Sequence, residues 1–302
     1  MGEEVSSELR QAQAKHFDAH TPFSPASLML RACGIEYPLI LKDELISQAL
    51  LELSPGIGYR VLDLGCGRGM LLDRLATSFR TQGFGVDVSR GTLKELHSES
   101  LHPHRVACSE GENLPFPDRS FDVAVSLDVL EHVQAPERVL DEMLRVLKPG
   151  GAVLCYAISR NNALTLNWFL MKALDAFGVN HWAWNGHAPD RLVDPLRTRK
   201  FLERRGCRIH SIRPFHSFFT VLFDLCMLFL YWLVTRLRLL EGRSDAHRYS
   251  AIRILKSLSR LVEMLWTPLN LLDAPWVSRG LSNGFLVTAT KPHASSRFSQ
   301  KP

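Results

Sequence analysis

The chain has 302 residues, of which 46% are hydrophobic and 22% charged, and its formal net charge at pH 7 is +5. This length and composition can supply the core of one large domain with insertions, and the sequence has no repeat or low-complexity tract. The six cysteines form no CxxC pair or ligand-like cluster, which argues against disulfides and a zinc site, and the chain begins without a basic, apolar signal peptide. We therefore expect reduced thiols and a cytoplasmic location, with membrane association left open.

The first predicted element is a buried strand at residues 61–64, which ends in a loop with glycines at alternate positions. Gly65, Gly67 and Gly69 allow the backbone to turn sharply and to pass close to the carboxylate and ribose of a ligand. Residues 70–76 follow with helical spacing, so we expect the loop to lead into a helix whose amide dipoles face the ligand. A G-x-G-x-G loop suits either S-adenosylmethionine (SAM) or a dinucleotide.

Acidic residues follow the next two predicted strands. Asp87 ends a short apolar strand roughly 20 residues after the glycines, where a carboxylate can accept hydrogen bonds from both ribose hydroxyls. The alternative interpretation of Asp87 is an acid in a surface turn. A third strand at residues 105–108 leads to Glu110, which could accept a hydrogen bond from an adenine amino group. These acids favour SAM over a dinucleotide.

The later predicted elements alternate between strand and helix, as in an α/β sheet. They are strands at residues 121–127, 151–158, 207–212 and 284–290, helices at residues 136–147 and 197–206, and a helix stop at residues 148–151. Ligands of such open sheets bind at the carboxyl ends of strands, beside a reversal of strand order. All candidate ligand contacts fall at such strand ends.

Four motifs occur in an order and spacing that a known family shares. They are VLDLGCGRG (residues 61–69), GVDVS (85–89), EGENLPFPDRSFDVAVSLDVLEHV (110–133) and LDEMLRVLKPGGAVLCYAI (140–158). On these motifs the chain resembles the class I SAM-dependent methyltransferases, in the branch of the ubiquinone and menaquinone biosynthesis enzymes, over roughly residues 55–156. Glu110 is a departure, because the family often has Asp there.

The resemblance implies an α/β fold with a Rossmann-like, seven-stranded, mostly parallel sheet, helices on both faces and SAM as cofactor. The cofactor-binding residues it predicts are Asp63, Gly65, Cys66, Gly67, Gly69, Asp87, Val88, Glu110, Gly111, Glu112 and Leu127. We expect an N-terminal helical cap (1–53), a SAM-binding core (54–214) with a lid insertion (159–190), an apolar and basic helical insertion (215–277), and a last strand with a tail (278–302). In the lid, Leu164, Trp168, Met171, Leu174 and Phe177 are expected to share an apolar helix face.

Asp128, Glu131 and His132 follow the fourth strand. If a helix begins here, the three side chains share one face, where they could hold a divalent ion or prepare the histidine as a base. The segment resembles the acid-x-x-Glu-His segment of the ubiquinone O-methyltransferases, where such residues are associated with a divalent metal. Glu-His at this place is structural in other members, so we predict no metal. Our candidate catalytic residues are His132, Asp128 and, near the lid, His187, and a structural role is the alternative for each.

The C-terminal third is basic and holds the longest apolar run. Residues 190–302 carry 19 Lys and Arg against 8 Asp and Glu, whereas residues 1–189 carry 17 against 23. The run at residues 218–234 is at the short limit for a membrane span, and Asp224 in its middle would cost roughly 2.5–3.5 kcal/mol on an insertion scale. Residues 251–266 have the pattern of a basic amphipathic helix. We predict peripheral membrane contact; a helical hairpin on the domain and a true span are the alternatives.

These observations together predict methyl transfer from SAM to a hydrophobic small molecule or lipid, such as a quinone-like ring or an isoprenoid. One alternative is a polar or nucleic-acid substrate, although nucleic acid is not expected as a partner. The other is a membrane-associated protein that binds SAM without methyl transfer. O-, N- and C-methylation use the same cofactor fold, so the sequence pattern does not select the acceptor atom.

Overall fold

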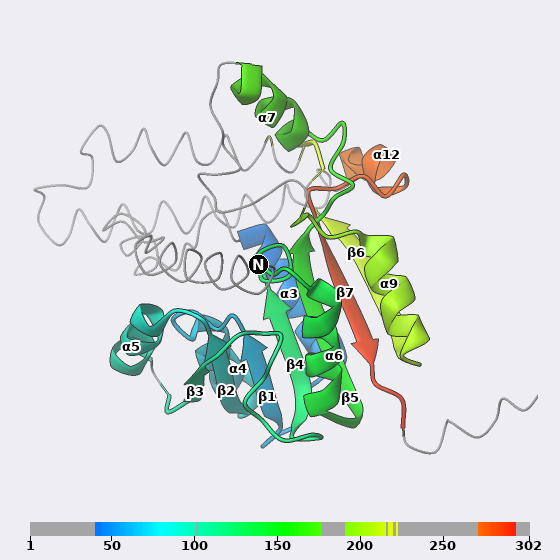
Figure 1. Ribbon diagram of the computed structural model, residues 1–302. Helices are drawn as coiled ribbons and strands as arrows, with labels where there is room; N and C mark the ends of the chain where they lie inside the picture. The colour runs from blue at the N-terminus through cyan, green and yellow to red at the C-terminus, as the bar shows by residue number, and fades with distance from the viewer. Residues whose placement is uncertain are drawn as a thin grey trace, which may run out of the picture.

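The computed structural model of the chain describes residues 40–100, 102–176, 191–215, 217–219, 222 and 271–293. Seven strands form one sheet in the order β3-β2-β1-β4-β5-β7-β6, and β7 runs antiparallel to β5 and β6 (Figure 1). The strands are β1 (Arg60–Leu64), β2 (Gln82–Asp87), β3 (Arg105–Cys108), β4 (Phe121–Leu127), β5 (Leu147–Ile158), β6 (Arg208–Phe215) and β7 (Gly284–Thr290). The predicted seven-stranded, mostly parallel sheet is confirmed.

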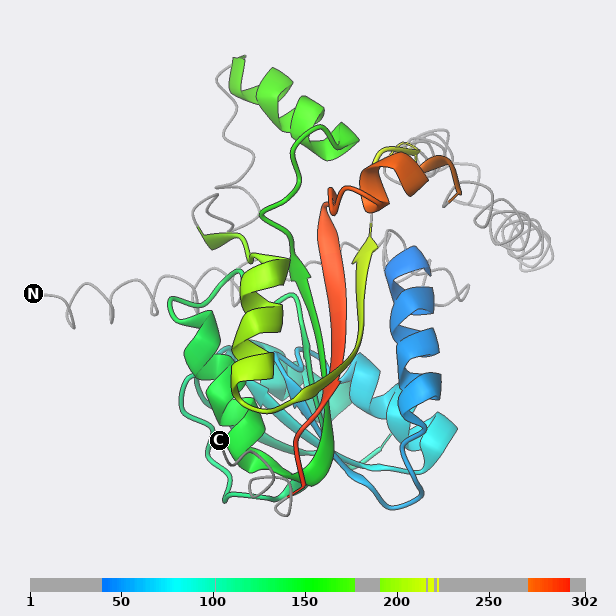
Figure 2. The same cartoon turned by 90° about the vertical axis from the view of Figure 1, so that its right-hand side faces the viewer.

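Helices cover both faces of the sheet, as predicted (Figure 2). One face carries α3 (Ile40–Leu53), α4 (Met70–Phe79) and α5 (Arg90–Glu99), and the other carries α6 (Pro136–Val146) and α9 (Pro195–Arg204). Two further helices, α7 (Leu166–Ala176) and α12 (Ala274–Val277), lie beyond the carboxyl ends of β4 and β5 (Figure 1). The described part of the predicted N-terminal cap is α3, which packs on the sheet through Ile46, Ala49 and Leu50.

The spacing of apolar residues explains how α6 packs. Val139, Leu140, Met143 and Leu144 recur at helical spacing, and all of them are buried against the sheet. Pro136 lies in the first turn, where a missing N–H is tolerated. After α6 the predicted stop interrupts the pairing of β4 with β5, because Phe121 pairs with Leu147 whereas Val123 pairs with Ala152.

Helix α7 begins at Leu166, after the first residue of the apolar face expected for the lid. Leu164 was expected on the apolar helix face, but it precedes the helix, is exposed and has a φ of 61°. The hydroxyl of Thr165 accepts a hydrogen bond from the N–H of Trp168 at 3.2 Å and so caps the helix after Leu164. Phe177 and His187 lie outside the described residues.

The chain just after β6 contacts the chain shortly before β7. The Asp273 carboxylate accepts hydrogen bonds from the N–H groups of Phe218 (2.9 Å) and Phe219 (2.8 Å), and the hydroxyl of Ser217 donates to the carbonyl of Leu281 (2.9 Å). The ring of Phe218 also stacks on Trp276, with centroids 5.3 Å apart. Residues 217–219 and Asp273 are therefore fixed beside each other.

The predicted apolar and basic helices at residues 218–234 and 251–266 lie outside the described residues, except for Phe218, Phe219 and Leu222. Within the described ranges, no helix combines the length and the hydropathy needed to cross a bilayer.

Candidate active site

The glycine loop after β1 has the backbone that the sequence predicts. Gly65, Gly67 and Gly69 all have positive φ angles, of 77°, 50° and 79°, which residues with a Cβ rarely adopt. A Cβ on Gly65 would clash with the side chain of Val129, which follows β4. The loops after β1 and β4 therefore pack directly against each other, at the point where the strand order reverses.

Asp87, at the end of β2, is fixed by two backbone N–H groups. One of its carboxylate oxygens accepts from Gly67 at 3.0 Å, and the other accepts from Ser89 at 2.8 Å. Ser89 is itself the N-cap of α5, because its hydroxyl accepts from the N–H of Thr92 at 3.0 Å. The carboxylate thus joins the glycine loop to the start of α5 and lies at the rim of the site.

Asp63 is a buried acid one residue before the end of β1. Its exposed fraction is 3%, and burial, together with the negative charge of Asp87, raises its pKa to about 7. Cys66 lies beside it, and burial raises the pKa of this thiol. A Cβ on Gly85 would come within 2.5 Å of the Cys66 sulfur, so the glycine in β2 makes room for the cysteine.

Glu110, Gly111 and Glu112 begin the loop between β3 and β4. The N–H of Ser109 donates to the carbonyl of Asp87 at 3.1 Å, which places this loop next to the end of β2. Gly111 is buried, and a Cβ there would press on Leu64 and Val139 at 3.3–3.4 Å. Glu110 and Glu112 are half-buried on either side of it. Of the other predicted cofactor contacts, Val88 is exposed and Leu127 half-buried, each at a strand end.

Residues 128–132 form a turn, so the helix on which the shared face of Asp128, Glu131 and His132 depended does not begin here. Asp128 has a φ of 55° and is exposed, whereas Glu131 is buried and one of its oxygens accepts from the N–H of Ile158 at 3.3 Å. The shared helix face that would have united the three side chains does not form. The described residues contain no group of three or more His, Cys, Asp or Glu side chains that could hold a metal.

Comparisons with known proteins agree with this geometry. The methyltransferase domain family matches residues 62–155. The ubiquinone biosynthesis O-methyltransferase of Ruegeria pomeroyi is 31% identical over 198 residues, which cover 61% of this chain and 76% of the relative. This chain is a class I SAM-dependent methyltransferase of the ubiquinone branch. The corresponding protein of Nitrobacter winogradskyi is 32% identical over 158 residues, which cover 50% of the methyltransferase and 58% of the relative.

Solved structures show the same fold for this methyltransferase. Phosphoethanolamine N-methyltransferase 2 of Haemonchus contortus, in complex with SAM, has a TM-score of 0.57 at 18% identity, covering 93% of this chain and 60% of that one. The cyclase SpnF has a TM-score of 0.51 at 21% identity, covering 83% of this chain and 81% of that one. At these identities the likeness concerns the fold alone.

The glycine loop and the acids beside it fit SAM, the cofactor of this methyltransferase. Three glycines with positive φ give the loop its sharp turn, and two acids lie at the ends of adjacent strands. Sequence reasoning named these residues but missed Ser89, which holds Asp87, and the pair Glu142 and Arg145, which holds the loop after β3. The spacing of Glu142 and Arg145 on one predicted helix was the signal available for that pair.

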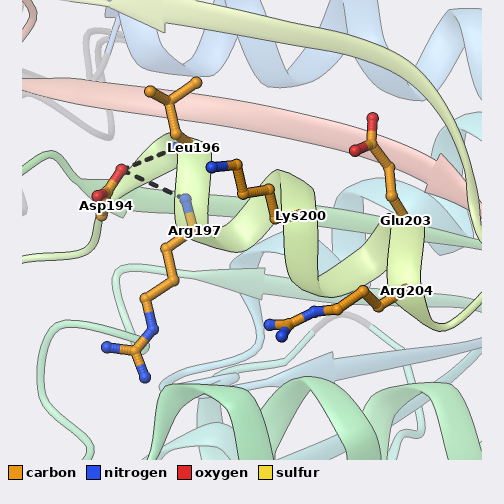
Figure 3. Close-up of a pocket in the computed structure, with 6 residues that line it drawn as sticks. All are labelled: Asp194, Leu196, Arg197, Lys200, Glu203 and Arg204. Atoms are coloured by element: carbon orange, nitrogen blue, oxygen red, sulfur yellow. Dashed lines mark hydrogen bonds between the residues drawn. The ribbon is translucent and has the colours of Figure 1, made fainter.

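An open depression lies along α9 (Figure 3). Its lining residues are Asp194, Leu196, Arg197, Lys200, Glu203 and Arg204. Asp194 caps the helix by accepting from the N–H groups of Leu196 (2.8 Å) and Arg197 (3.3 Å). Arg197 pairs with Glu137 of α6 at 2.8 Å. Asp194 and Arg197 therefore have structural roles in this depression. None of the glycine-loop residues line it.

Proposed function

We propose that this methyltransferase transfers a methyl group from SAM to a hydroxyl oxygen on a hydrophobic, quinone-like ring. The observation that carries the proposal is the glycine loop joined to Asp87 at the strand reversal, in a chain that shares about a third of its aligned residues with ubiquinone biosynthesis O-methyltransferases. The names of those relatives support a hydroxyl acceptor and a ring substrate.

Three acids would hold the cofactor. Asp87 would accept hydrogen bonds from the ribose hydroxyls, Glu110 would accept from the adenine amino group, and buried Asp63 would balance positive charge at the amino-acid end. When bound, SAM supplies a methyl group already activated by the sulfonium. The remaining tasks of the protein are to orient the acceptor oxygen, to exclude water and to take up the hydroxyl proton.

His132 is our candidate for the residue that takes up this proton, and exposed Asp128 is the second candidate. His132 is half-buried with its ring Nδ1 shielded from solvent, and the backbone N–H of the residue donates to the carbonyl of Val129 at 2.9 Å. Replacing a general base typically lowers kcat by about 10²–10⁴-fold. His132→Gln should therefore lower kcat by at least about 100-fold while the Kd for SAM stays within about twofold. An unchanged kcat would assign His132 a structural role.

The acceptor would approach from the end of the molecule that carries α7 and α12 (Figure 1). Apolar side chains from separate segments are exposed there, including Leu164, Phe169, Leu271 and Leu272, with Leu271 exposed by 70%. The indole N–H of Trp276 donates to the carbonyl of Leu164 at 2.8 Å and ties two of these segments together. Such a surface supports an acceptor with an apolar tail, and we propose peripheral contact with a membrane on the same side.

The function is tested by measuring release of S-adenosylhomocysteine (SAH). The purified chain is given a hydroxylated benzene ring with a short prenyl tail, the same ring without the tail, and a nucleic-acid acceptor. We expect turnover with the tailed ring, at a kcat/KM at least about tenfold above the untailed ring. Turnover on nucleic acid alone would favour the polar-substrate alternative. Saturable SAM binding with no turnover on any acceptor would favour a protein that binds SAM without methyl transfer.

A further inference from the structure

Arg145 on α6 uses every donor of its guanidinium within a short stretch of chain. Nε and Nη2 donate to the two carboxylate oxygens of Glu142 at 2.7 and 2.8 Å. Nη1 donates to the carbonyl of Phe116 and to the carboxylate of Asp118, both at 2.8 Å, and Nη2 also donates to the carbonyl of Leu114 at 3.0 Å. These five hydrogen bonds match the five N–H donors that an arginine has.

Glu142 holds the same stretch of chain as a hydrogen-bond acceptor. Its Oε2 accepts a hydrogen bond from the N–H of Leu114 at 2.8 Å. Both backbone groups of Leu114 are therefore held by one ion pair on α6, and the Leu114 side chain is buried in the core. A lysine in place of Arg145 would keep the charge but could not reproduce this planar set of contacts.

The ion pair is partly shielded and stays charged over the physiological range. The exposed fractions of the Arg145 and Glu142 side chains are 32% and 17%. The hydrogen bonds from Arg145 lower the pKa of Glu142 and also that of Asp118. Near neutral pH the contacts to Leu114 and Phe116 are therefore made by charged groups, which hydrogen-bond more strongly than neutral ones.

The stretch that carries the adenine-side acids is fixed at both ends. At its start, the N–H of Ser109 donates to the carbonyl of Asp87, and at its end Glu142 and Arg145 hold Leu114. Between them, Gly111 packs on Leu64 and on Val139, which also belongs to α6. Glu110 and Glu112 lie on this short stretch, so α6 holds the end of the backbone that carries them.

We infer that Arg145 and Glu142 are positioning residues for adenine recognition: they hold the loop after β3 so that Glu110 meets the exocyclic amino group of the adenine. The contact between Glu110 and adenine belongs to the proposed function, and this inference depends on it. The two residues touch no reacting atom; they act through the backbone of Leu114.

The inference is tested with two ligands and three variants. Calorimetry gives the Kd of SAH and of its analogue in which the 6-amino group of the purine is replaced by hydrogen. The variants are Arg145→Lys, Glu110→Gln and, as a matched control, Arg205→Lys. Arg205 makes a comparable two-bond pair with Asp141, also on α6, at 2.6 Å for each bond, but it does not touch the loop.

The wild-type protein should bind SAH about tenfold more tightly than the analogue, the size of a hydrogen bond to a charged group. Arg145→Lys should bring this ratio close to one by weakening SAH binding, with little effect on the analogue, and Arg205→Lys should keep the wild-type ratio. In turnover, Arg145→Lys should raise the KM for SAM with kcat nearly unchanged. If Arg145→Lys does not fold, Glu142→Gln, which keeps the side-chain shape, should lower the ratio in the same direction.

A wild-type ratio kept by Arg145→Lys, or an equal loss of affinity for both ligands, overturns the positioning role while leaving the Glu110 contact in place. Two other outcomes would show that the contact between Glu110 and adenine is itself wrong. If wild-type protein does not distinguish the two ligands, or if Glu110→Gln keeps the ratio, both the adenine contact and the inference built on it are wrong.

Discussion

Asp63 couples the stability of the fold to pH. Its pKa in the folded chain is about 7, against about 3.9 for an unperturbed aspartate, because burial and Asp87 both disfavour its negative charge. Between these two values the folded chain keeps a proton that the unfolded chain has lost. The contribution of Asp63 to the free energy of unfolding is therefore fully present below about pH 4 and is lost as the pH rises through about 7.

Replacing Asp63 by Asn should remove this dependence. Urea unfolding between pH 5 and pH 8 should show that the free energy of unfolding falls with pH in the wild-type protein and is flatter in Asp63→Asn. Asp118 and Glu142 do not interfere, because their pKa values are lowered and their contributions are lost only as the medium becomes more acidic. Parallel profiles for the two proteins would contradict the assignment of the titration to Asp63.

Asp87 is expected to contribute to cofactor affinity more than to the fold. Its carboxylate lies at the rim of the site and accepts from Gly67 and Ser89. Asp87→Ala should weaken SAM binding by at least about tenfold, the size of one lost hydrogen bond to a charged acceptor. Calorimetric titration measures this, and Asp141→Ala, which removes an acid exposed on α6, is the matched control. Equal affinities for wild type and Asp87→Ala would remove the ribose contact from the proposal.

Among the helices, α9 shows which contacts hold an element in place. Two ion pairs join its side of the domain to α6, Arg197 with Glu137 and Arg205 with Asp141, but all four side chains are well exposed. Exposed pairs of this kind contribute about 0–1 kcal/mol each. Phe201 and Leu202 are buried in the core instead. Apolar burial therefore accounts for most of the attachment of α9.

Two substitutions separate these contributions. Phe201→Ala should lower the free energy of unfolding by about 3–5 kcal/mol, because it removes buried surface and leaves a cavity. Arg197→Ala should lower it by less than about 1 kcal/mol. Denaturant unfolding of both variants at the same pH and salt concentration checks this order. A loss from Arg197→Ala as large as that from Phe201→Ala would mean that the ion pair, and not the core, anchors the helix.

The elements were predictable from the sequence where a periodic apolar pattern fixed them. The last strand, Gly284–Thr290, has the predicted limits, and α6 ends within one residue of its prediction. The segment after β4 was not predictable in this way. Asp128 adopts a left-handed backbone and the chain turns, so the helix that the one-face arrangement of Asp128, Glu131 and His132 required does not form. The spacing of three residues places them on one face only if the segment is helical. Here the segment is a turn in which Val129 packs against Gly65, a contact that local spacing does not predict.

For the whole molecule, the sheet type followed from the motifs, and the end of β2 with Asp87 lies beside the glycine loop because β1 and β2 are adjacent parallel strands. The Arg145 and Glu142 contacts with Leu114 could not be inferred, because they join residues about 30 positions apart through backbone groups that no sequence pattern marks. The same holds for Asp273, which holds Phe218 and Phe219 from across the insertion.

The Asp273 contacts lead to a prediction about residues 220–270. Since Phe219 and Asp273 already touch, a linker of about six Gly and Ser residues can join the two ends without stretching the chain. β6 and β7 pair from Arg208 to Phe215 on either side of the junction, so the sheet does not have to change. We expect the shortened protein to fold and to bind SAM within about twofold of the wild-type Kd, but to lose sedimentation with anionic lipid vesicles.

Asp273→Ala in the full-length chain is the companion variant. It leaves the N–H groups of Phe218 and Phe219 without their acceptor and should lower the free energy of unfolding by about 1–3 kcal/mol. Calorimetry with SAM, thermal unfolding and vesicle sedimentation on the same preparations separate the possibilities. If the shortened protein fails to fold while Asp273→Ala folds, residues 220–270 are part of the core. If it folds and still sediments with vesicles, the exposed leucines near α12 account for membrane contact by themselves, because Leu271 and Leu272 remain in place.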